Sequence, residues 1–116
     1  MGDVYNISQT GQGHQVVIQK GEELKARLGN IQLEEGQAGL DADIADLVDQ
    51  VMRSDDLSAN QKKQILEALE STEAELERAP ARRDKSRIRQ ALDTAYDVAK
   101  AAVPIAAAIA KIASLF

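Results

Sequence analysis

The chain has 116 residues and a net charge of −5, and aromatic residues make up only 3% of it. This acidic, aromatic-poor composition is not that of a nucleic-acid-binding protein. The absence of cysteine excludes a disulfide framework, a thiolate zinc site and a cysteine nucleophile.

Residues 1–20 are predicted to form a β-hairpin. Two short runs of strand-prone residues flank TGQGH, whose glycines suit a tight turn. Alternation along the strands gives an interface of Tyr5, Ile7, Val16 and Ile18. A lone hairpin is marginally stable in water, so either the chain's own helices or strands of other copies must cover this interface. The uncharged strands, which contain Asn and Gln, favour the second alternative and make the hairpin an assembly element.

Residues 21–40 are predicted to be a linker with a short helix at EELKARL, because three glycines interrupt residues 29–40. Residues 41–53 form the first predicted long helix. Asp41 is its expected N-cap, and its apolar residues recur at helical spacing.

A second helix is predicted over residues 58–79. Ser58 and Gln61 have the spacing of a capping box at its start. Pro80 ends the helix, because proline cannot donate the hydrogen bond that would continue it.

A third helix is predicted from its N-cap, Asp84, to Phe116. Its apolar residues recur every seven positions in two interleaved series, which is typical of a coiled-coil or bundle seam. Pro104 lies off this seam and is expected to kink the helix or interrupt its hydrogen bonds. The short loop before Asp84 indicates that the last two helices form a long antiparallel hairpin. The predicted seam consists of Ile88, Ala91, Ala95, Val98, Ala102, Ile105, Ile109, Ile112 and Phe116.

The apolar C-terminal stretch VAKAAVPIAAAIAKIASLF has two interpretations. It is a core helix or an oligomer seam, or it is a membrane-active helix that inserts after assembly. Its only charged residues, Lys100 and Lys111, share one face and argue against a permanent transmembrane helix.

A basic cluster precedes this stretch. It either neutralises the acidic residues between positions 34 and 56, or it binds anionic lipid beside an inserting helix. The cluster consists of Arg78, Arg82, Arg83, Lys85, Arg87 and Arg89.

Groups that could catalyse a reaction do not converge in the sequence. His14 is the only histidine and falls in the predicted turn, and no serine has a histidine near it. DADIAD resembles the start of a calcium loop but lacks the glycine and glutamate that such a loop requires further on. We therefore expect no enzyme, no metal and no cofactor.

The N-terminal segment GDVYNISQTGQGHQVVIQ resembles bacterial amyloid-signalling motifs. The helical region that follows is loosely similar to the Bell and HeLo-like membrane-targeting domains. This resemblance implies a small protein of a bacterial immunity or programmed-death system. In such families the β motif nucleates assembly and the helices permeabilise membranes.

The sequence thus predicts a mainly α-helical chain with a hairpin over 1–20, a linker over 21–40 and a helical bundle over 41–116. The expected function is non-enzymatic self-assembly into a homo-oligomer through the hairpin and the C-terminal helix. The alternative is a membrane-permeabilising effector. Expected partners are further copies of the chain, a larger signalling protein or an anionic membrane, but not nucleic acid. We expect a cytoplasmic protein, which associates with membranes on activation under the alternative.

Overall fold

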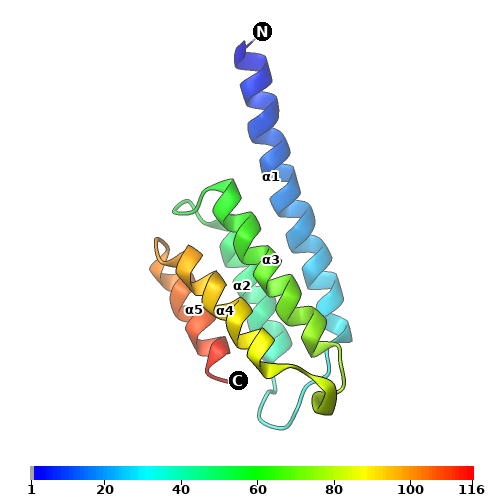
Figure 1. Ribbon diagram of the computed structural model, residues 1–116. Helices are drawn as coiled ribbons and strands as arrows, with labels where there is room; N and C mark the ends of the chain where they lie inside the picture. Colours follow the sequence, from blue (N-terminus) through cyan, green and yellow to red (C-terminus); the bar gives the residue numbers. More distant parts are fainter. Residues whose placement is uncertain (1) are drawn as a thin grey trace.

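The structure is a computed structural model that describes residues 2–116, with side chains described from residue 15 onward. Within this part, successive helices run in opposite directions, and short 3-10 turns at Leu28–Asn30 and Pro80–Arg82 lie in two of the connections (Figure 1). The five α-helices are α1 (Gly2–Arg27), α2 (Leu40–Arg53), α3 (Ala59–Leu76), α4 (Lys85–Ala99) and α5 (Val103–Ala113).

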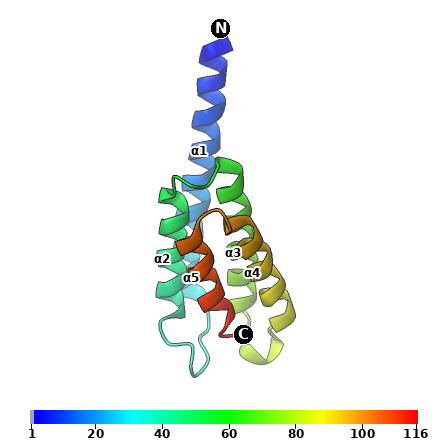
Figure 2. The same ribbon diagram turned by 90° about the vertical axis from the view of Figure 1, so that its left-hand side faces the viewer.

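One apolar core runs through the bundle, and each helix contributes to it. Leu24, Leu47, Leu69, Leu92 and Ile109, one from each helix in chain order, are completely buried. Helix α5 packs against α2 and α4, on the side of the bundle away from α1 (Figures 1 and 2). The mainly helical fold and the bundle predicted from the sequence are confirmed.

Helix α2 begins one residue earlier than predicted and has a different cap. Its N-cap is Gly39, whose φ of 83° lies in the left-handed region that glycine adopts without strain. The prediction that Asp41 caps the helix is therefore wrong. Asp41 lies in the first turn instead, where a negative charge interacts favourably with the positive end of the helix dipole.

The predicted caps of the next two helices are confirmed. The backbone N–H of Gln61 donates to Ser58 Oγ over 3.1 Å, and the Gln61 side chain accepts from the Ser58 N–H over 2.8 Å, which completes the capping box. Asp84 accepts a hydrogen bond of 3.2 Å from the backbone N–H of Arg87 at the start of α4. Helix α3 ends at Leu76, three residues before the predicted end.

The helix predicted from Asp84 to Phe116 is two helices, because the chain turns back between α4 and α5; of the two effects expected of Pro104, the structure shows the interruption. Pro104 lies in the first turn of α5. Backbone N–H groups in the first turn have no acceptor within the helix, so a proline there costs no hydrogen bond. The Ala102 carbonyl accepts from Ile105 and Ala106 and starts the new helix. Helix α4 therefore pairs with both α3 and α5, and the long antiparallel hairpin becomes three shorter helices.

The backbone of α1 runs through the segment predicted to be a hairpin, and its first half projects beyond the other helices (Figure 1). Tyr5 and Ile7 lie outside the residues whose side chains are described, so their part of the predicted interface is not tested. Val16 and Ile18 lie in α1 and are 38% and 46% exposed, whereas Val17 between them is buried; the hairpin as a whole stays a prediction. Helical rather than alternating spacing decides which residue faces the core.

Candidate functional site

The second half of α1 docks on α2 and α3 through a narrow apolar stripe. Val17, Leu24 and Leu28 are all buried and recur at helical spacing. Gly21 completes this stripe, and a Cβ added there would overlap the Met52 side chain of α2. The absence of a side chain at position 21 therefore leaves room for the Met52 side chain to pack against α1.

Lysines beside this stripe pair with acidic residues of both neighbouring helices. Lys20 Nζ lies 3.9 Å from Glu67 Oε1 and 3.6 Å from Glu70 Oε1, both on α3. Lys25 Nζ lies 2.9 Å from Asp49 Oδ1 on α2. The hydrogen bond to Asp49 raises the pKa of Lys25, which therefore stays protonated. The positive charges on the docked half of α1 thus lie opposite negative charges on α2 and α3.

A buried carboxyl group lies within the same interface. Glu73 of α3 is 1% exposed, and among the described residues its Oε1 has no hydrogen-bond partner. Burial raises the pKa of Glu73 from the ordinary 4.5 to about 7, and a hydrogen bond with Glu77 and the charges of Glu77 and Glu70 add to the effect. Arg27 of α1 acts in the opposite direction. Glu73 therefore changes its charge close to neutral pH.

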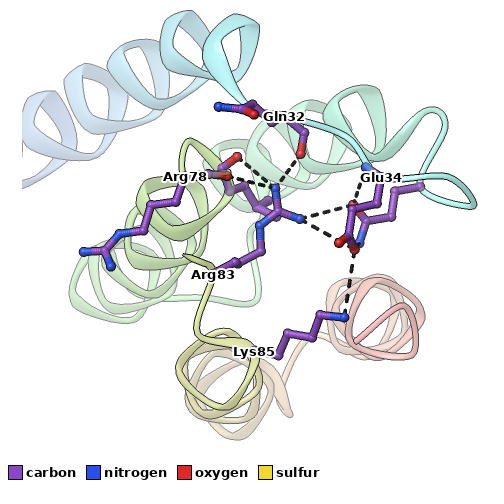
Figure 3. A network of polar contacts seen from close by, with 7 residues as sticks. Gln32, Glu34, Arg78, Arg83 and Lys85 are labelled. Atoms are coloured by element: carbon purple, nitrogen blue, oxygen red, sulfur yellow. Dashed lines mark hydrogen bonds and ion pairs between the residues drawn. The ribbon is translucent and has the colours of Figure 1, made fainter. Parts of the chain in front are cut away.

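The connector between α1 and α2 is held at the other end of the bundle by Arg83 (Figure 3). The Arg83 side chain is fully buried. Its Nη2 donates to the Gln32 carbonyl over 2.6 Å, to that of Leu76 over 3.2 Å and to that of Arg78 over 3.3 Å. Its Nη1 lies 3.9 Å from Glu34 Oε2. One guanidinium thus satisfies carbonyls at the end of α3 and binds the connector to them.

The fold divides the predicted basic cluster, because one of its members is buried and the others stay on the surface. Arg83 is buried, and Lys85 lies 4.0 Å from Glu34. Arg78 and Arg87 both lie within 4.0 Å of the Glu75 carboxylate. Most of the cluster is thus engaged by carboxylates or carbonyls of the same chain.

The predicted C-terminal seam packs inside the chain rather than facing outward. Ala91, Val98 and Phe116 are partly buried against the core. The remaining seam residues are buried in it: Ile88, Ala95, Ala102, Ile105, Ile109 and Ile112. Contact of these six buried residues with another copy would require the bundle to open.

A hollow of about 640 Å³ lies between the end of α2 and the start of α5. Aspartates line much of it, with Arg53 among them. Among the described residues, no three His, Cys, Asp or Glu side chains are grouped closely enough to hold a metal ion.

Three features were not found from the sequence: Gly21 and Glu73 in the α1 interface, and Arg83 at the connector. Gly21 has a detectable signal, because it lies at helical spacing between Val17 and Leu24. No sequence signal marks the burial of Glu73 or the carbonyl contacts of Arg83, because both depend on segments that are distant in sequence.

Comparison with protein families, with curated proteins and with solved structures finds no match to this chain. In the part of the chain that the structure describes, no helix combines the length and the apolar character needed to cross a bilayer.

Proposed function

We propose that the protein is a non-enzymatic self-assembly module that forms a homo-oligomer through α1. The observation that carries this proposal is the position of α1, whose first half extends past the bundle while its second half is docked (Figure 1). The bundle provides a folded base, and the projecting segment is the part offered to other copies.

The composition of the projecting segment supports this role. Residues 2–14 include three glycines and several residues that favour strands. A helix of this length without tertiary packing is marginal in water, so a partner would stabilise it. Val16 and Ile18 are exposed where the helix leaves the bundle, and they offer apolar surface to a partner there.

The assembled form of the segment is either helical or the predicted hairpin. Paired strands from several copies would satisfy the backbone that a lone hairpin leaves open. Infrared amide I spectra of the oligomer distinguish the two, because a β-sheet band appears only in the second. A role in a bacterial defence system would agree with the amyloid-signalling resemblance of this segment.

Light scattering after size exclusion tests the proposal. We expect the full chain to form a discrete oligomer, and a chain that begins at Gln15 to form a smaller species with its helical circular dichroism preserved. Ile18→Lys should weaken the oligomer, whereas Gln19→Lys, a matched change at an exposed neighbour, should not. A full chain that stays monomeric at millimolar concentration would contradict the proposal.

The alternative function is permeabilisation of membranes by the C-terminal helices. Helix α5 has 11 residues, so it spans about 16 Å, roughly half of a bilayer core of about 30 Å. Under this alternative α5 would lie in the interface rather than cross it. Leakage of vesicles rich in phosphatidylglycerol, caused by the full chain but not by Val103→Asp at an exposed residue of α5, would favour it over self-assembly alone.

A further inference from the structure

The contacts that attach α1 to the bundle all lie on one side of its second half. These contacts fall within residues 17–28. They are the apolar stripe, the contact of Gly21 with Met52, and the ion pairs of Lys20 and Lys25. An identical α1 from another copy carries the same stripe and the same charges. It therefore fits the face of α2 and α3 as well as the chain's own helix does.

The connector is long enough for such an exchange. Residues 31–39 form no regular helix or strand, and nine extended residues span about 30 Å. The whole molecule measures 26 and 21 Å across its two shorter axes. A straightened connector would thus carry α1 to an adjacent copy. The Arg83 contacts to Gln32 and Glu34 favour the folded-back arrangement.

Glu73 supplies a means of loosening this interface. The charged groups around it are Arg27 from α1, and Glu70 and Glu77 from its own helix. When α1 is docked, the Glu73 carboxylate is buried, and its Oε1 has no hydrogen-bond partner in the described part of the chain. When α1 leaves, the carboxylate is hydrated, so its ionisation favours release.

We propose that the face of α2 and α3 beneath α1 is an exchangeable docking surface, that its second occupant is α1 of another copy, and that ionisation of Glu73 opens it. This inference rests on the proposed self-assembly and adds a second contact between copies to the one that residues 2–14 make. Glu73 is equally buried whether its own α1 or that of a neighbour covers it. Its charge therefore sets the rate of exchange and not the balance between the two arrangements.

The sign of the pH effect follows from the pKa of Glu73, which is about 7 when α1 is docked and near 4.5 when the group is in water. The free energy that holds α1 on α2 and α3 decreases as the pH rises from about 4.5 to 7. Above that pH it changes little. Exchange should therefore be slow in acid and faster at neutral pH.

Disulfide trapping between two different copies tests the exchange, because the natural chain has no cysteine. One copy carries Gly21→Cys with Met52→Ala, and the other carries Met52→Cys. The two positions are close enough for a disulfide only when α1 of the first copy covers the bundle of the second. The matched control replaces Gly21→Cys by Ala26→Cys, an exposed position of α1.

We expect a covalent heterodimer that forms at pH 7.5 at least ten times faster than with the Ala26→Cys control. Glu73→Gln in both copies should slow it on the order of a hundred-fold, the factor that a pKa change from 4.5 to about 7 implies at this pH. Glu67→Gln, which removes an exposed partner of Lys20, should change the rate by less than about five-fold. Circular dichroism checks that every variant is folded.

A heterodimer yield no higher than the control would overturn the docking surface. Equal rates for the parent pair and the Glu73→Gln pair would overturn the role of Glu73. Light scattering on the same samples separates these failures from failure of the proposed function. An oligomer that persists without cross-linking leaves self-assembly standing through another contact, whereas a monomer contradicts self-assembly itself.

Discussion

Gly21 of α1 lies so close to Met52 of α2 that no Cβ fits between them without moving the methionine. Glycine in a helix interior costs about 1 kcal/mol relative to alanine. In α1 this cost is offset by the closer packing of two helices. The residue that would be expected to interrupt a helix is therefore part of the interface that holds this one.

A large side chain at position 21 should push α1 away from α2. We expect Gly21→Leu to lower the free energy of unfolding by about 1–3 kcal/mol, the usual cost of overpacking, as measured by urea denaturation. Met52→Ala in the same chain should recover part of this loss, because it creates space at the contact.

Gly29→Leu is the matched control, since the structure shows no described atom within 4 Å of a Cβ at that position. It should change the stability by less than about 1 kcal/mol. An equal loss at both glycines, or no coupling between positions 21 and 52, would argue against the close contact.

Glu73 should make the folded protein less stable as the pH rises. Its pKa is about 7 in the folded chain and near 4.5 when exposed, so between these values the folded state binds the extra proton. Raising the pH through this window should therefore lower the free energy of unfolding by up to about 3 kcal/mol, because each pKa unit corresponds to about 1.4 kcal/mol. The quantity to measure is the difference in stability between the parent and Glu73→Gln, which isolates the contribution of Glu73.

We expect Glu73→Gln to equal the parent near pH 4.5 and to exceed it in stability at pH 7.5, by urea denaturation at both values. Glu67→Gln, at an exposed site of the same helix, should keep the pH slope of the parent. A Glu73→Gln protein that is less stable than the parent at pH 7.5 would show that the carboxylate is stabilising in place.

Local signals in the sequence predicted much of the helical bundle. Ser58 with Gln61, and Asp84, were recognised as caps because such caps act within three residues and need no tertiary contact. The heptad series was also real, since the residues it named are in the core. Seven-residue spacing, however, does not distinguish one long helix from two that fold back on the same core.

The structure shows that there are two helices, with Pro104 in the first turn of the second. Proline is tolerated in the first turn of a helix and disfavoured further inside, so it fits a new start better than a kink. The course of α1 was missed for another reason. Val16–Ile18 favour strands locally, but burial of Val17 together with Leu24 selects the helical period. Tertiary packing outweighed local propensity there.

Arg83 should contribute strongly to stability because its charge is buried among carbonyl groups. Arg83→Met leaves the carbonyls of Gln32, Leu76 and Arg78 without this donor, and we expect a loss of about 3 kcal/mol in urea denaturation. Arg83→Lys should recover less than half of it, because one ammonium group cannot reproduce the planar fork. Arg82→Met, at the exposed neighbour, should cost less than about 0.5 kcal/mol; a loss equal to that of Arg83→Met would contradict the assigned role.

Ile109 should report where the C-terminal seam packs. It is fully buried within its own chain, so Ile109→Ala should lower the free energy of unfolding by about 2–4 kcal/mol through the cavity it leaves. Val103→Ala, at a residue 72% exposed on the same helix, should cost less than about 0.5 kcal/mol. Because the Ile109 contacts are made within one copy, the loss should be the same at 1 and 100 µM protein, concentrations on the order of those used in denaturation work. A loss that grows with protein concentration would instead place Ile109 between copies, as the seven-residue spacing alone had suggested.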